Sequence, residues 1–393
     1  MLYKMKNNTC YHTAIIGAGA SGLFCAGSFD APKIVLEANA KPALKVSVSG
    51  GGKCNFSNRF ISAANYESRN KHFCKSALAA FTPADFTALL DEERVPWEER
   101  ENGQLFAKNA KDIVHFLLKR AQAHHSQIAL GVRVLDIQKD TTGFVLATSS
   151  GPIRAQHVVL ASGGVSFPAL GGNSLAAKIA RQFKLNFVEQ RPVLCGLSFP
   201  KNLRPLCTQL AGNSLPVVIR QNKHVFEGDL LFTHDGISGP AVLQLSLFWQ
   251  PEIPVEIDFL PHQNAAEILA AHKNSTHALS SVFDLPHKLA KTLLASCDGP
   301  LATATREQLR AAVQTLHHFS FTATSTAGYT KAEATAGGID TREINPSTLE
   351  ARRAPGLFVT GEALDVTGNL GGYNLHWAWA SGFAAAQALR HRF

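Results

Sequence analysis

Three glycines and a downstream acid near the start of the chain have the spacing of a nucleotide-binding turn. An apolar run, Ala14–Ile16, leads into Gly17-x-Gly19-x-x-Gly22, and Glu37 ends a second apolar run. Gly17 permits a tight turn, Gly19 lets the backbone approach a pyrophosphate, and Gly22 lets a helix pack closely on the strand. Glu37 would accept hydrogen bonds from the adenosine ribose hydroxyls. The pattern predicts a strand–turn–helix–strand unit that binds a dinucleotide, with the helix N-terminus facing the pyrophosphate.

A second glycine-rich segment, Ser49–Asn58, has consecutive glycines at 50, 51 and 52. Three glycines in a row cost conformational entropy unless the backbone lies against a ligand or adopts positive φ. We predict a turn of exposed N–H groups beside Lys45 and Lys53, which suits an anion or the polar edge of a ring. Cys54 and Asn55 could hydrogen-bond a heterocycle there. A flexible loop is the alternative interpretation.

A third signal lies near the end of the chain. A predicted strand ends at Gly361, and Glu362 and Asp365 follow it. Gly371-Gly372 then opens a predicted helix from about Leu375 to Leu389, whose N-terminus would stabilise a reduced, anionic flavin at its pyrimidine edge. Asp365 could hold the ribityl hydroxyls. We interpret the two tryptophans of this helix, at 377 and 379, as core residues.

Two further motifs leave alternatives open. Gly163-Gly164 follows a predicted buried strand and is either a second nucleotide contact or a tight chain reversal. It lacks the GxGxxG pattern, so the chain has no second Rossmann domain for NAD(P)H. His234 and Asp235 form either an acid/base pair or the polar tip of a Gly/Pro turn. The seven dispersed cysteines and the adjacent histidine pairs predict neither disulfides nor a metal site.

Composition limits the class of protein. The chain has 393 residues, of which 45% are hydrophobic and 17% charged, which is typical of a globular protein. No apolar run is long enough to span a bilayer, and Met1–Cys10 lacks a secretory signal, so we expect a cytoplasmic protein. The net charge of +8 is compatible with nucleic acid or with an anionic cofactor, but the cations are dispersed. We therefore favour a solvated basic surface over a nucleic-acid partner.

The composition and the predicted elements of the chain change near residue 190. Short β-rich segments with many prolines follow it, and residues 263–318 have a helical pattern. Residues 331–334 are predicted to be a strand that returns to the β-rich part. We expect an α/β cofactor domain in two pieces, 1–190 and 340–393. A β-barrel-like subdomain (191–262 and 319–339) and a helical insert (263–318) would interrupt it.

Taken together, the motifs resemble the BaiN/YhiN-type, aminoacetone-oxidase-like FAD-binding flavoproteins. The resemblance covers nearly the whole chain and includes Leu231–Pro240 and Thr335–Ile339 besides the glycine motifs above. It implies a glutathione-reductase-like, Rossmann-type FAD domain interrupted by a β-barrel and a small helical insert. It also implies a backbone contact from Val134 to adenine.

The motifs and the resemblance together imply the following FAD contacts: Gly17, Gly19, Ala20, Ser21, Gly22, Glu37, Ala38, Lys45, Gly51, Gly52, Cys54, Asn55, Val134, Gly163, Glu362, Asp365, Gly372, Asn374 and Leu375. Three residues, His234, Asp235 and Cys54, are the candidates for catalysis. No metal ligand is expected.

The resemblance implies an FAD-dependent oxidoreductase that acts on a small organic molecule by hydride transfer through flavin N5. One hypothesis is reduction of a conjugated enone with NADPH or NADH as the diffusible donor. A second is oxidation of an amino ketone or amine by oxygen. A third, from another class, is an RNA-associated flavoprotein that binds RNA through a basic insert. The oligomeric state is not predicted.

Overall fold

The computed structural model describes residues 10–393, so all of the predicted N-terminal lead except Cys10 lies outside the described residues. The chain forms two compact units. One contains residues up to Arg191 together with Ala334–Phe393, and the other contains Pro192–Glu333. Each unit has its own hydrophobic core.

A seven-stranded mixed sheet forms the centre of the first unit, with the order β7-β2-β1-β10-β9-β8 and β20 paired to β10. The strands are β1 (Cys10–Ile16), β2 (Lys33–Glu37), β7 (Ser126–Leu130), β8 (Val134–Lys139), β9 (Phe144–Thr148), β10 (Gly151–Leu160) and β20 (Leu357–Val359). All pairings are parallel except those of β9, which runs antiparallel to β8 and β10.

The register of these strands explains where the motifs meet. Ile16 lies beside Leu36 and Leu160, and Leu160 lies beside Val359. The loops that leave β1, β2, β10 and β20 therefore emerge at one edge of the sheet. In open α/β sheets this carboxyl edge is where ligands bind.

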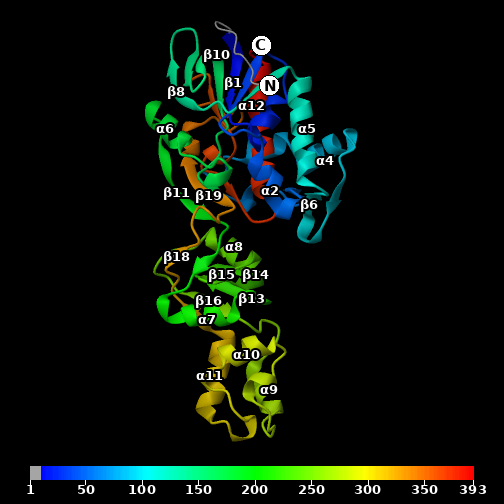
Figure 1. Cartoon of the computed structure of the whole chain (residues 1–393), viewed down its shortest axis with the longest axis vertical. Helices are drawn as coiled ribbons and strands as arrows, with labels where there is room; N and C mark the ends of the chain where they lie inside the picture. The colour runs from blue at the N-terminus through cyan, green and yellow to red at the C-terminus, as the bar shows by residue number, and fades with distance from the viewer. Residues whose placement is uncertain (1–9) are drawn as a thin grey trace. The chain divides into compact units, whose positions relative to one another are not determined.

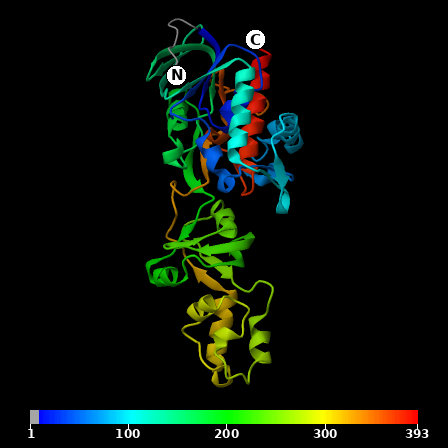
Figure 2. The same cartoon turned by 45° about the vertical axis from the view of Figure 1, so that its right-hand side comes forward.

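Seven helices accompany this sheet: α1 (Ala20–Ala26), α2 (Leu44–Gly52), α3 (Lys75–Ala80), α4 (Pro83–Glu92), α5 (Ala110–Ala123), α6 (Leu175–Gln182) and α12 (Tyr373–Arg390). Local sequence sets their starts. Thr82 and Asp85 form a capping box at α4, with Pro83 in the first turn, and the Asn109 side chain accepts the Lys111 N–H at α5. Figures 1 and 2 show α5 and α12 running roughly parallel to each other.

Helix α12 is buried along most of its length. Trp377 and Trp379 are 2% and 0% exposed, which confirms that both are core residues. Gly382 brings α12 close to α1, because a Cβ at this position would lie 2.6 Å from the Ser21 carbonyl oxygen.

Three small sheets complete the unit. β3 (Asn55–Asn58) and β5 (Trp97–Glu99) flank β6 (Gln104–Ala107), β4 (Tyr66–Glu67) pairs with β21 (Thr367–Gly368), and β11 (Phe187–Val193) pairs with β19 (Ala334–Ile339).

A seven-stranded sheet, antiparallel throughout, and a group of helices form the second unit, 192–333. The sheet order is β17-β16-β13-β14-β15-β12-β18. Its strands are β12 (Leu197–Ser198), β13 (Ser214–Gln221), β14 (His224–Phe232), β15 (Gly236–Ser238), β16 (Val255–Asp258), β17 (Phe319–Phe321) and β18 (Ser325–Thr326). Its helices are α7 (Arg204–Leu210), α8 (Pro240–Ser246), α9 (Ala265–Ala271), α10 (His287–Leu293) and α11 (Arg306–His317). Within this unit α9, α10 and α11 gather at one end (Figure 1).

The α/β class agrees with the prediction, but one local expectation is wrong. Residues 331–333 are not a strand, since β19 begins at Ala334. Helix α2 starts at Leu44, a helix that the sequence did not indicate, and Ser49, Gly50 and Gly51 have non-helical φ/ψ at its end.

Candidate functional site

The turn between β1 and α1 requires glycine at positions 17 and 22 because a Cβ at either position would clash with backbone atoms of the protein. Gly17 has φ +108°, and a Cβ there would lie 2.4 Å from the Ala161 carbonyl oxygen. A Cβ at Gly22 would lie 1.9 Å from the Gly17 carbonyl oxygen. Gly19 is different, because its φ is −87° and a Cβ would meet no protein atom within 4 Å. The turn therefore leaves open space beside Gly19, as a bound pyrophosphate requires.

Glu37 is held at the end of β2, directly beside this turn. One carboxylate oxygen accepts the Ala18 N–H (2.8 Å), and the other accepts two bonds from Asn39, from its N–H (2.9 Å) and its side-chain amide (2.7 Å). The oxygen that accepts the Ala18 N–H has a second lone pair, so the acid can still accept a ribose hydroxyl there. The Val132 N–H donates to the Glu37 carbonyl (2.8 Å), which brings the start of β8 at Val134 to the same place.

The glycines after α2 adopt the backbone conformation that the sequence predicts. Gly50, Gly51 and Gly52 have φ of +55°, +66° and +83°. A Cβ at Gly50 would lie 2.8 Å from the Asn55 N, whereas Gly51 and Gly52 face open space. The Asn55 amide lies 2.8 Å from the Gln104 side-chain oxygen.

Glu362 is the centre of a polar cluster that joins four segments of the first unit, including α2 and β19. Its carboxylate accepts the Lys45 ammonium (2.7 Å), the Gly164 N–H (3.2 Å) and the Thr335 N–H (2.6 Å). Burial opposes its charge, but Lys45 and the two backbone donors outweigh burial and lower the pKa of Glu362. A Cβ at Gly163 would lie 3.7 Å from the Lys45 ammonium, so Gly163 is part of this cluster.

The segment before α12 contains the remaining predicted contacts. Asp365 is 6% exposed and accepts the Arg69 N–H (2.9 Å). Burial raises the pKa of Asp365, and the Arg69 N–H acts in the opposite direction. The Asn374 amide forms two bonds with the backbone of Gly368, one as acceptor (2.8 Å) and one as donor (3.0 Å).

The three catalytic candidates belong to different units, Cys54 to the first and His234 and Asp235 to the second. The Cys54 side chain is 0% exposed, and burial raises the pKa of its thiol to about 12, so it stays protonated at neutral pH. His234 and Asp235 are exposed on the turn between β14 and β15, in the second unit. Their geometry is that of the polar turn tip that the sequence left as the alternative.

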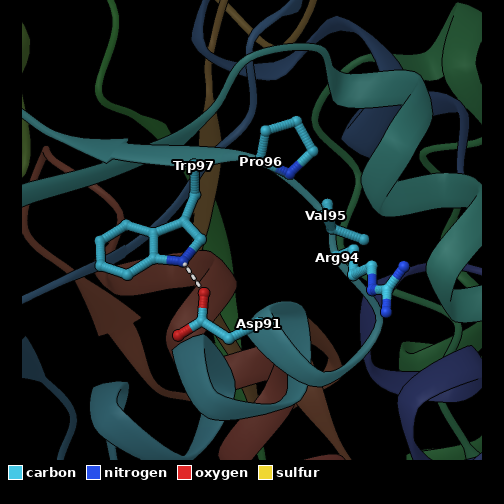
Figure 3. A pocket seen from close by; sticks show the side chains of 5 residues that line it. All are labelled: Asp91, Arg94, Val95, Pro96 and Trp97. Carbon is cyan, nitrogen blue, oxygen red and sulfur yellow. Dashed lines mark hydrogen bonds between the residues drawn. The ribbon is translucent and has the colours of Figure 1, made fainter.

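One surface hollow lies apart from these motifs. Asp91, Arg94, Val95, Pro96 and Trp97 line it, and the Trp97 indole N–H donates to Asp91 (2.7 Å; Figure 3). None of the predicted contact residues lines this hollow.

Two kinds of feature are absent from residues 10–393. No helix there is long and apolar enough to cross a membrane. No group of three or more His, Cys, Asp or Glu side chains has the arrangement of a metal site.

A family model described as the HI0933-like protein Rossmann domain matches residues 11–388 of the chain. The chain belongs to the HI0933-like family. This HI0933-like chain is 40% identical to the ribosomal RNA dihydrouridine synthase of Escherichia coli (strain K12), over 96% of this chain and 98% of that protein. It is 30% identical to the 3-dehydro-bile acid delta(4,6)-reductase of Clostridium scindens, over 96% of this chain and 98% of that protein.

A solved structure shares the fold of this HI0933-like chain. A quinol–fumarate reductase with menaquinol molecules superposes with a TM-score of 0.52 at 16% identity, over 98% of this chain and 71% of that one. The family resemblance inferred from the motifs is confirmed, and the protein is an FAD-dependent oxidoreductase with a Rossmann-type FAD domain.

The residues present fit FAD. A Cβ at Gly19, Gly51 or Gly52 would meet no protein atom within 4 Å, so the backbone at these glycines is open to a ligand. The Glu37 carboxylate lies at the end of β2, beside the first of these turns. The residues that would hold the cofactor are those of the Gly17–Gly22 turn, Glu37, the Gly50–Gly52 turn and the 362–375 segment.

The partners that hold these residues in place were not predicted from the sequence. Asn39 binds the Glu37 carboxylate, Thr335 and Gly164 bind Glu362, and Arg69 binds Asp365. Asn39 is two residues from Glu37 and could have been noticed as a local partner. The others lie between 27 and 296 residues from the acids they bind, and nothing local indicates them.

We expect Asn374→Ala to weaken FAD retention, because Gly368 loses both hydrogen bonds that fix the segment before α12. Removing such bonds costs about 1–2 kcal/mol. Flavin absorbance per protein after gel filtration measures the effect. Asn213→Ala is the matched control, since Asn213 also bonds a backbone carbonyl (Leu210, 2.8 Å) but lies in the second unit. Equal loss of FAD in both variants would contradict the expectation.

Proposed function

We propose that this protein reduces the C5=C6 double bond of a uridine in ribosomal RNA to give dihydrouridine. The observation that supports this most directly is the 40% identity, over nearly the full length of both chains, to a protein named for that activity. The dispersed cations of the sequence favoured a small-molecule substrate over nucleic acid, and we now propose the opposite. Such a substrate would place the protein in the cytoplasm.

The chemistry joins this proposal to the enone hypothesis. The C5=C6 bond of uracil is conjugated to the C4 carbonyl, so it is an α,β-unsaturated carbonyl system. Reduction adds a hydride at C6 and a proton at C5, and the two electrons of the hydride come from a donor such as NADPH or NADH. A bile-acid Δ(4,6)-reductase, by its name, acts on double bonds of a steroid, so one kind of reaction accounts for both relatives' names.

The protein's own groups would position the reactants. When bound, FAD would supply the hydride chemistry that the reduction needs. Glu362, which follows β20, joins α2 through Lys45, the loop after β10 through Gly164, and β19 through Thr335. The N-terminus of α12 follows Gly372, and its partial positive charge favours negative charge nearby.

Incubation of the purified protein with NADPH or NADH and ribosomal RNA from cells that lack the activity tests the proposal. We expect nucleosides digested from that RNA to contain a new dihydrouridine, heavier than uridine by two hydrogen atoms. Protein stripped of FAD is the matched control. The absence of dihydrouridine with both donors would contradict the proposal.

The same preparation tests the other two hypotheses. Consumption of NAD(P)H with a steroid enone would favour the small-molecule reductase. Oxygen uptake with an amino ketone would favour the oxidase.

A further inference from the structure

One segment of the first unit, Asn58–Lys75, runs antiparallel to the segment that precedes α12. At its centre β4 pairs with β21, with Glu67 opposite Thr367 and Tyr66 opposite Gly368. Past β4, the Arg69 N–H donates to the Asp365 carboxylate (2.9 Å). The Asn58–Lys75 segment is therefore fixed, by backbone bonds, to residues expected to hold the cofactor.

Asn58 fixes the other end of the same segment. Its side chain is 2% exposed and donates to the carbonyls of Gly371 (3.1 Å) and Asn102 (3.1 Å). The same side chain accepts the Phe60 N–H (2.9 Å). A single buried amide therefore joins the Phe60 turn to the glycine pair that opens α12.

The exposed side chains of this segment include three cations and an aromatic ring. Arg69, Lys71 and Lys75 are exposed, and none of them forms an ion pair within residues 10–393. Asp365 and Asp340 feel the charge of Arg69 only at longer range. Phe60 is 65% exposed, so its ring is accessible from solvent. From 58 to 75 the segment has four Lys or Arg and one acid, Glu67.

The second unit offers no such charge. Residues 192–333 contain ten Lys or Arg and eleven Asp or Glu, a net charge of −1. The insert is therefore not basic overall, and its net charge gives no support to it as the RNA-binding module. The rest of the sequence carries +9, so long-range attraction would bring a polyanion to the first unit.

We propose that the outward face of Asn58–Lys75 binds single-stranded RNA, with Arg69, Lys71 and Lys75 on successive phosphates and Phe60 stacked on a base. This inference rests on the proposed function and names the surface that presents the substrate. Proteins that bind single strands combine cations along the backbone with exposed aromatic rings. Asn58 and β4 fix this face relative to residues 365–373, which are expected to hold the cofactor. RNA bound on this face would therefore be held at a defined position relative to the flavin.

Fluorescence anisotropy with a short labelled oligouridylate, at several salt concentrations, measures the contribution of the cations. The double variant Lys71→Ala/Lys75→Ala should bind about 10-fold more weakly at low salt, and the slope of log affinity against log salt should fall by about 1.4. Phe60→Ala should lower affinity about 10-fold with the salt slope unchanged, because stacking releases no counterions. The matched control is Lys288→Ala/Lys291→Ala on α10, two exposed lysines of the second unit.

Flavin absorbance of each variant shows that the first unit is folded, and dihydrouridine formed in ribosomal RNA is measured in parallel. If wild-type protein makes dihydrouridine but the Lys71/Lys75 and Lys288/Lys291 variants bind equally well, this inference is overturned and the proposed function stands. If wild-type protein makes none but binds RNA through Lys71 and Lys75, the proposed function fails and the inference stands. Absence of any RNA binding overturns the inference.

Discussion

Replacing Gly19 by valine is expected to give a folded protein that purifies with at least about 10-fold less FAD. The φ of Gly19, −87°, is one that valine adopts without strain, and its Cβ would meet no protein atom within 4 Å. The new side chain therefore costs the protein itself little. It would occupy the space beside the turn where the pyrophosphate is expected to lie. The ratio of flavin to protein absorbance measures the loss, and the melting temperature of the FAD-free protein shows that the fold is intact.

Gly299→Val is the matched control for this experiment. A Cβ added at Gly299 would also have no protein atom within 4 Å, and Gly299 has no positive φ, but it lies in the second unit. We expect this variant to retain its FAD. Normal FAD content in Gly19→Val would show that the cofactor does not approach the Gly17–Gly22 turn.

The nucleotide-binding entry could be predicted because its determinants are local. The positive φ of Gly17 and the close approach of Gly22 to the Gly17 carbonyl are properties of the β1–α1 turn itself, and the loop after β10 adds a distant contact to both at Ala161. The same holds for α12, since the glycines at 371 and 372 and the apolar residues after them mark its start and its burial. Helical and strand periodicity at 110–130 likewise needs no tertiary information.

Features that depend on distant partners could not be predicted. The Asn58–Lys75 segment has no strong periodicity, and β4 exists because it pairs with β21, about 300 residues later. Cys54 was a catalytic candidate because nothing in the sequence shows that its side chain is buried. Its burial, which keeps the thiol protonated, depends on tertiary packing.

Glu362→Gln is expected to destabilise the first unit by about 2–3 kcal/mol at neutral pH. Its carboxylate accepts three donors, from Lys45, Gly164 and Thr335. Glutamine keeps one oxygen for them and turns an amide N–H₂ toward the rest, so at least one donor loses its partner. The Lys45 ammonium also loses its counter-charge. Urea unfolding of the FAD-free protein measures the difference, and Glu307→Gln, an exposed acid at the start of α11, is the control.

The effect of Glu362→Gln should depend on pH in a defined direction. The pKa of Glu362 is lowered in the folded protein from an ordinary value of 4.5, so the unfolded chain takes up a proton first as the pH falls. The carboxylate therefore stabilises the fold fully above about pH 4.5, and this contribution is lost as the pH falls through the lowered folded pKa. We expect the stability gap between wild type and Glu362→Gln to be constant from about pH 7 to pH 5 and to shrink below that range. A gap that instead grew on acidification would mean that Glu362 is protonated in the folded state, and the Lys45–Glu362 ion pair would then not be what joins these segments.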